Sequence, residues 1–274
     1  MRGPRVLRTT GTIAVNVFRE SVRDKVLYNL VVFALLLMGA SYLIGQLTAG
    51  QDVKIIKDLG LAAITVFGLF IAIFIGIGLV SKEVERRSIY SLLAKPVRRH
   101  EFIAGKYAGL VLTLAVNVAV MTVAFYLVLG YMSATEGEVM RRAWEAPALD
   151  PRLLEAIFLI FIELMLVTAI ALFFSSFSSP ILSAAFTVGL VIVGQFDADL
   201  KNFQSIVDSQ AVGAITRGLY YVLPNMAAFD VKAQVVHAVP VAPGYLLVTA
   251  AYGLAYVLVF VLAAMVIFAR RDFK

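Results

Sequence analysis

Long apolar stretches dominate the hydrophobic pattern of this chain. Six segments are apolar over about the 20 residues that a helix needs to cross a bilayer. They are Val26–Leu47, Leu59–Val80, Tyr107–Met132, Leu153–Ser175, Pro180–Phe196 and Tyr245–Ala269, of which the fifth is short. The pattern predicts an all-α polytopic membrane protein with six transmembrane helices in a single domain over residues 1–274. The first segment is long enough to be a retained helix, so we expect no cleaved signal peptide.

Composition supports a membrane protein. The chain is 61% hydrophobic with a mean hydropathy of +0.90, whereas soluble domains are closer to half apolar. The net charge of +6 could indicate a nucleic-acid partner, but the basic residues lie beside apolar segments, so we expect membrane orientation and no nucleic acid. The absence of cysteine excludes disulfides and thiolate metal ligands, and we expect no metal site.

The distribution of basic residues predicts the orientation. About two-thirds of the 24 lysines and arginines fall in the N-terminal tail, the loop after the second span and the C-terminal tail. The richer side is cytoplasmic by the positive-inside rule, which places both termini in the cytoplasm. A seventh span around Ala211–Phe229 is disfavoured, because it would bury Arg217 in the bilayer and move Arg270 and Arg271 outside.

The segment before the first span is amphipathic. Asn16, Arg19, Glu20 and Arg23 form a polar face, while Ala14, Phe18 and Val22, widened by Ile13 and Val17, form an apolar face. This pattern predicts a helix at Ile13–Asp24, within the cytoplasmic tail at 1–25, that lies in the membrane interface. It is either a lipid-anchored lead-in to the first span or an elbow helix that also contacts a cytoplasmic partner.

The cytoplasmic loop at 81–106 is the second candidate. Glu83–Leu93 can form a short helix with apolar positions at Val84, Ile89, Leu92 and Leu93, and Pro96 ends it. A solvated loop would need only polar residues. The apolar positions need cover, so a docking helix between the second and third spans is the better interpretation.

Polar and small residues inside the spans are further candidates. Glu163 lies near the middle of the fourth span, where an ionisable group is costly. It is either a substrate contact in the pathway or a neutral, hydrogen-bonded lock between helices, and Asn117 is expected to assist helix packing. Gly105 and Gly109 form a GxxxG pair that allows close helix approach, mostly within the chain. The helical periodicity at 200–222 predicts an external helical hairpin in the loop at 197–244.

The cytoplasmic loop resembles that of ABC-2 type transporter permeases. The residues that carry the resemblance are Glu85, Arg86, Arg87, Ser88, Ile89, Leu92–Leu93, Lys95–Pro96–Val97, Arg99, Phe102 and Gly105–Lys106. The branch linked to multicopper-enzyme maturation is the most similar, because Asn16, Phe18–Arg19–Glu20, Arg23–Asp24, Leu223–Pro224–Asn225 and Phe229–Asp230 also resemble it. Many family members have a glycine where Arg87 stands in this chain. The identity of the substrate therefore cannot be carried over from the family to this chain.

The resemblance implies the transmembrane subunit of an ATP-driven exporter in the plasma membrane, the inner membrane of bacteria. Two permease copies, identical or paralogous, would pair, and two separate ATPase subunits would bind ATP and Mg. The implied ATPase-coupling residues are Glu85, Arg86, Ile89, Leu92, Leu93, Pro96 and Arg99, with Glu85 as the first polar contact. The implied elbow residues are Phe18, Arg19, Glu20 and Arg23.

The chain is not expected to be an enzyme or to bind a cofactor itself. A Walker A loop needs two glycines before its lysine, but His100 stands at the first of these positions before Gly105–Lys106. No catalytic residues are predicted. Two alternatives remain, a membrane scaffold or mechanotransmitter driven by an ATPase, and a secondary transporter. The latter usually has more spans and several intramembrane charges.

Overall fold

The computed structural model describes residues 3–46, 52–85, 99–144, 146–196 and 223–270. The helices are α1 (Gly3–Val22), α2 (Lys25–Gln46), α3 (Asp52–Glu85), α5 (Arg99–Thr135), α6 (Glu138–Ala143), α7 (Leu153–Ser175), α8 (Pro180–Gln195), the 3-10 helix η2 (Ala227–Phe229), α11 (Lys232–Val236) and α12 (Pro243–Arg270). Over these residues all regular structure is helical, which confirms the all-α fold class.

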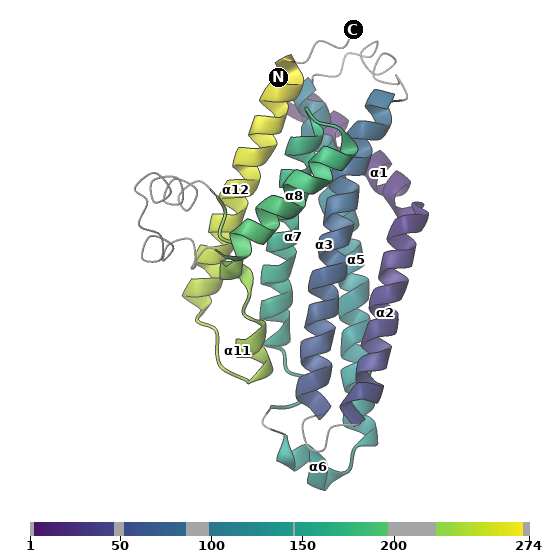
Figure 1. Cartoon of the computed structure of the whole chain (residues 1–274), viewed down its shortest axis with the longest axis vertical. Helices are drawn as coiled ribbons and strands as arrows, with labels where there is room; N and C mark the ends of the chain where they lie inside the picture. Colours follow the sequence, from purple (N-terminus) through teal and green to yellow (C-terminus); the bar gives the residue numbers. More distant parts are fainter. Residues whose placement is uncertain (1–2, 47–51, 86–98, 145, 197–222, 271–274) are drawn as a thin grey trace, which may run out of the picture.

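Long helices run along one another in an elongated bundle (Figure 1). Among the described residues, α2, α3, α5, α7 and α12 are the five that are long and apolar enough to cross a membrane. The most apolar window is 72% buried in α7 and 61% buried in α3, against 22–28% in the other three. Helices α7 and α3 therefore form the centre of the bundle, and the others expose apolar faces as expected in lipid.

The prediction of a sixth spanning helix is not confirmed, because α8 has only 16 residues. At a rise of 1.5 Å per residue it is about 24 Å long, less than the ~30 Å of a bilayer core. The chain nevertheless reaches the far end of the bundle after α8. There Arg152 Nη1, at the start of α7, donates a 2.7 Å hydrogen bond to the carbonyl of Ala238. The chain that includes η2 and α11 therefore reaches the end of the bundle where α7 begins.

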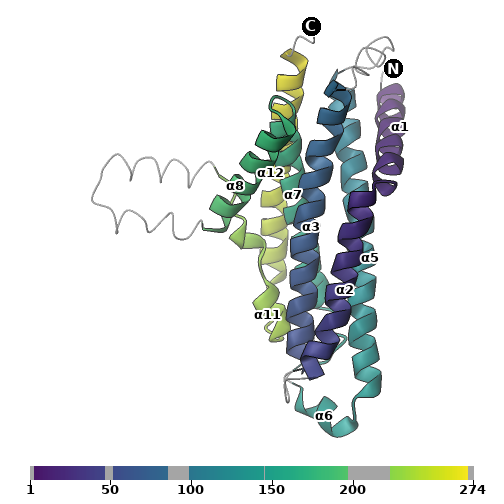
Figure 2. The same ribbon diagram turned by 45° about the vertical axis from the view of Figure 1, so that its right-hand side comes forward.

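One end of the bundle gathers α1, the last turn of α3, the first turn of α5 and the last turn of α12 (Figure 2). Exposed basic residues lie here, including Arg19, Arg23, Lys25 and Arg270. Part of the expected cytoplasmic loop is helical, because α3 continues to Glu85 and α5 already begins at Arg99. Glu83 therefore belongs to α3 rather than starting a separate helix, since no proline or glycine interrupts α3 after Val80.

Small residues bring the two central helices together. A Cβ atom added to Gly76 of α3 would lie 2.5 Å from the Cβ of Ala171 in α7, and one added to Gly68 would lie 2.5 Å from Leu164 Cδ1. Close packing of this kind is the main source of helix association where lipid surrounds the bundle. Helices α3 and α7 are therefore expected to move as one unit.

Candidate functional site

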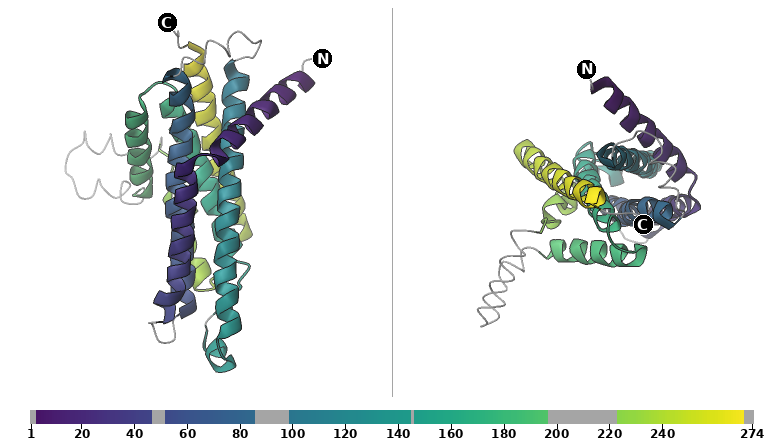
Figure 3. Two further views of the ribbon diagram at one scale, coloured as in Figure 1. Left: turned by 90° about the vertical axis from the view of Figure 1, so that its right-hand side faces the viewer. Right: turned by 90° about the horizontal axis from the view of Figure 1, so that it is seen from above.

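The amphipathic helix α1 leaves the start of α2 at an angle and lies across the upper part of α5 (Figure 3). Gly105 and Gly109 of α5 form the surface that receives it. A Cβ atom on Gly105 would lie 2.8 Å from Ile13 Cβ, and one on Gly109 would lie 2.6 Å from the carbonyl oxygen of Ala14. The GxxxG pair therefore packs two helices of the same chain together.

Only part of the apolar face of α1 contacts the bundle. Val17 is buried and Ile13 packs against the core, whereas Phe18 is half-buried and Val22 is exposed. The polar elbow residues Arg19, Glu20 and Arg23 are exposed. One apolar stripe of α1, with Ile13 and Val17, thus packs against the bundle. A second apolar stripe, with Phe18 and Val22, is left to contact lipid.

A short turn separates α1 from α2. The backbone N–H of Asp24 donates to the carbonyl of Ser21 at 3.0 Å, which ends α1. The Oδ1 of Asp24 then accepts a 3.0 Å hydrogen bond from the N–H of Val26 in the first turn of α2. Aspartate at the N-cap position satisfies one of the free amides at a helix start. The turn between α1 and α2 is therefore specified locally by Asp24.

The predicted coupling segment is flanked by structure at the same end. Glu85 is the last residue of α3 and Arg99 the first of α5, whereas Arg86, Ile89, Leu92, Leu93 and Pro96 lie outside the described residues. The first turns of α5 are fixed to α12, because the rings of Phe102 and Phe268 stack with centroids 5.7 Å apart. The buried Lys106 Nζ lies 4.6 Å from the centroid of the Phe102 ring.

Glu163 lies inside the bundle, with 6% of its surface exposed. Its Oε1 accepts a 3.1 Å hydrogen bond from Nε2 of Gln195, the last residue of α8. Lys232 and Asp230, which form an ion pair of 3.3 Å, are close enough to interact with Glu163 electrostatically. This geometry is that of a polar connection between α7 and α8, one of the two roles expected for Glu163.

Asn117 has a different environment from Glu163. Its Nδ2 donates a 2.7 Å hydrogen bond to the carbonyl of Thr113, one turn earlier in α5. The amide is half-buried. The hydrogen bond therefore stays within one helix and does not join two helices.

The segment Leu223–Pro224–Asn225, noted in the sequence, closes the end of α8. The N–H of Met226 donates to the carbonyl of Gly194 at 3.0 Å, and the N–H of Asn225 donates to Tyr252 Oη of α12 at 2.8 Å. Asn225 Oδ1 accepts from the N–H of Ala228 at 3.0 Å, which starts η2. This segment ties α8 to α12 beside Glu163. The hairpin predicted at 200–222 lies outside the described residues.

The burial of Lys57 was not predicted from the sequence. Lys57 precedes the second span predicted at Leu59–Val80, but α3 begins at Asp52 and the Lys57 side chain is completely buried. Nothing in the local sequence separates Lys57 from its neighbours Lys54 and Asp58, because its partner is far away in the chain. Among the described residues, no group of three or more histidine, aspartate or glutamate side chains could hold a metal ion.

The bundle of apolar helices with an amphipathic helix packed at one end is that of a polytopic membrane protein. The profile of the family described as ABC-2 family transporter protein matches residues 12–273. The match covers almost the whole chain, so this protein belongs to the ABC-2 transporter family. It is a permease subunit of an ABC transporter, a family whose permeases work with an ABC ATPase in the membrane. Family membership sets aside the secondary-transporter alternative.

No curated protein matches the chain. The narrower branch linked to multicopper-enzyme maturation stays a prediction that rests on the residues named above.

Proposed function

We propose that this chain is the permease of an ATP-driven ABC-2 exporter. Two permease copies, identical or paralogous, form the membrane unit, and two separate ATPase subunits bind ATP and Mg at its cytoplasmic end. Membership of the ABC-2 family over residues 12–273 is the observation that carries the proposal. The gathering of α1 and the ends of α3 and α5 at one basic end supports it.

The proposed coupling route starts at residues 86–98, between the ends of α3 and α5. Closure of the ATPase pair displaces this segment, with Glu85 and Arg99 at its two ends. Helix α5 carries the displacement to α1 through Gly105 and Gly109, which contact α1 directly. Helix α3 carries it to α7 through the close contact of Gly76 with Ala171. The pathway then opens outward between the two copies.

The proposed topology has six crossings with both termini in the cytoplasm. Helices α2, α3, α5, α7 and α12 make five of them, and α8 with residues 223–242 makes the sixth. The hydrogen bond from Arg152 to Ala238 supports this path, because it brings the chain after α8 to the end where α7 begins. The basic residues at the other end favour a cytoplasmic position for it in a plasma membrane.

Stimulated ATP hydrolysis tests the proposal. The ATPase subunit that binds this chain is reconstituted into liposomes with and without the permease, and phosphate release is measured. We expect the permease to raise the hydrolysis rate and to make it dependent on the coupling segment. An unchanged rate, with the permease present and folded, contradicts ATP-driven transport through this chain.

A further inference from the structure

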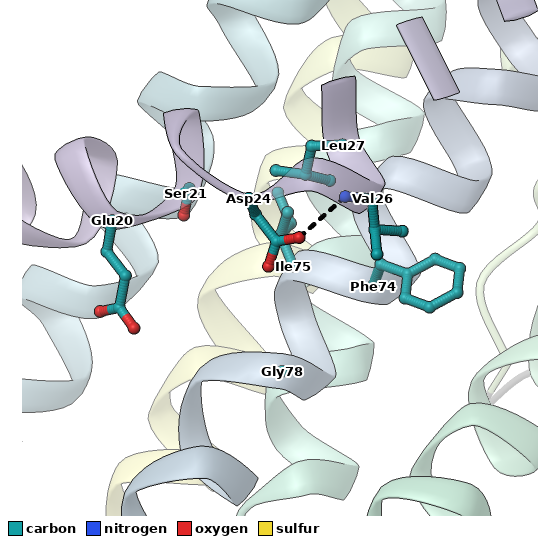
Figure 4. A pocket seen from close by; sticks show the side chains of 8 residues that line it. All are labelled: Glu20, Ser21, Asp24, Val26, Leu27, Phe74, Ile75 and Gly78. Atoms are coloured by element: carbon teal, nitrogen blue, oxygen red, sulfur yellow. Dashed lines mark hydrogen bonds between the residues drawn. The ribbon is translucent and has the colours of Figure 1, made fainter. Parts of the chain in front are cut away.

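A cavity of about 270 Å³ lies at the elbow, between the end of α1, the start of α2 and α3. Its polar lining comes from Glu20, Ser21 and Asp24. Its apolar lining includes Val26 from α2, with Phe74 and Ile75 from α3 (Figure 4). The cavity thus has one acidic side and one apolar side, which is the pattern that an amphiphile needs.

The cavity lies at the boundary between hydrocarbon and water. The apolar window of α2 begins at Lys25, and that of α3 ends at Gly78, a residue that itself lines the cavity. Two independent helices therefore place it at the level of lipid headgroups. Its apolar side is open to the surroundings, because Val26 is 45% and Phe74 53% exposed.

The polar side is rich in hydrogen-bond acceptors. Ser21 is 94% buried, yet its hydroxyl has no hydrogen-bond partner among the described residues. Glu20 likewise makes no ion pair there, and Asp24 adds a second carboxylate that also caps α2. The hydroxyl lines the cavity, so a donor group placed there can bind it. The Glu20 carboxylate beside it favours a cation.

We propose that this cavity binds the headgroup of an aminophospholipid from the adjacent leaflet. A primary ammonium has N–H donors for Ser21 and Glu20, whereas a choline group has none. Carboxylates also disfavour an anionic headgroup. The exposed Arg23 and Lys25 alternate with the lining residues along the chain and can approach the lipid phosphate. The bound lipid bridges α1 and α3, independently of the proposed ATP-driven transport.

Competitive lipid retention tests this site. The full chain is purified in mild detergent, incubated with equal amounts of phosphatidylethanolamine and phosphatidylcholine, and examined by native mass spectrometry. We expect roughly tenfold preference for the ethanolamine lipid, as one charged hydrogen bond would supply. Glu20→Gln and Ser21→Ala are expected to bring the ratio close to one. Glu138→Gln, the same charge change in α6 at the opposite end, is expected to leave it unchanged.

Three results would overturn the proposal. One is equal retention of the two lipids by the unaltered chain. Another is preference for phosphatidylglycerol, which indicates a basic site. The third is an unchanged ethanolamine preference in a monodisperse Glu20→Gln variant. The cysteine-free chain also allows Glu20→Cys, and its efficient disulfide dimerisation in membranes would assign the cavity to a second copy instead.

Discussion

The Nζ of Lys57 donates a 2.9 Å hydrogen bond to the carbonyl oxygen of Pro147, a residue 90 positions later in the chain. Lys57 has no exposed surface, and the buried Asp150 is close enough to interact with it electrostatically. Tyr126 of α5 donates to the carbonyl of Asp150 at 3.0 Å. A buried charge is tolerated only with such partners. Together these contacts fasten α3, α5 and the start of α7 at the end opposite the elbow.

The first prediction concerns this buried lysine. Lys57→Met keeps the length of the side chain but removes the donor to Pro147 and the positive charge near Asp150. We expect the free energy of unfolding in detergent to fall by about 2–4 kcal/mol, because a buried acceptor and a buried carboxylate lose their partner. Lys54→Met, the same change at a less buried position one turn earlier, is the matched control. Equal losses in the two variants would contradict the assigned role.

A second prediction separates the two roles of Glu163 by a double-mutant cycle. If the hydrogen bond to Gln195 holds α7 against α8, the losses of unfolding free energy caused by Glu163→Ala and Gln195→Ala do not add up in the double variant. We expect a coupling energy of about 0.5–1.5 kcal/mol, the range for interhelical hydrogen bonds in membranes. Unfolding in mixed micelles measures it.

The control for this cycle pairs Glu163→Ala with Asn117→Ala, because the Asn117 amide bonds within its own helix. The coupling energy between Glu163→Ala and Asn117→Ala is expected to be near zero. Two results together would instead assign Glu163 to the transport pathway. The unfolding free energies would be additive in the Glu163 and Gln195 cycle, and Glu163→Gln would lose transport.

The third prediction concerns the packing contact between α1 and α5. Gly109→Val forces a side chain against the backbone of Ala14, and overpacking of this kind costs about 1–3 kcal/mol. We expect α1 to detach more often and trypsin to cleave at Arg19 and Arg23 about tenfold faster. Gly39→Val is the control, because no atom lies within 4 Å of the Cβ position there. Cleavage at an unchanged rate in Gly109→Val would show that α1 is held by other contacts.

The fourth prediction tests the coupling segment. Leu92→Asp with Leu93→Asp places two charges at the apolar positions of the predicted docking helix. We expect loss of ATPase binding and of its stimulation, without a change in the melting temperature of the permease. Val139→Asp with Val239→Asp, at exposed positions of the described structure, is the matched double control. Retention of the ATPase by the Leu92 and Leu93 variant would mean that another surface docks it.

The helices predicted from the sequence agree with the structure where a local residue pattern sets their ends. The fourth span was predicted at Leu153–Ser175, the bounds of α7, because a long and mostly apolar run begins after Arg152 and stops at a serine pair. Helix α1 was predicted to begin at Ile13 but begins at Gly3, since its first turns contain basic and polar residues with no apolar stripe.

Contacts between distant segments were beyond sequence reasoning. Glu163 stood out because charge is rare inside a span, but its partner Gln195 did not, as an amide at a helix end has many explanations. The sequence around Lys57 does not distinguish it from a solvated lysine, because its partner Pro147 is adjacent only in the folded chain. The segment Pro180–Phe196 was apolar enough for a span but is too short in the structure. The contact of Ala238 with Arg152, which brings the chain after α8 to the start of α7, could not be read from the sequence.

The most direct test of the central claim is affinity purification of the tagged chain from its native membranes in mild detergent, with mass spectrometry of the proteins that accompany it. We predict a Walker A ATPase in equal amount, with the permease present in two copies per complex. Purification of the chain alone, with no ATPase recovered even after cross-linking in the membrane, would contradict an ATP-driven transporter built on this permease.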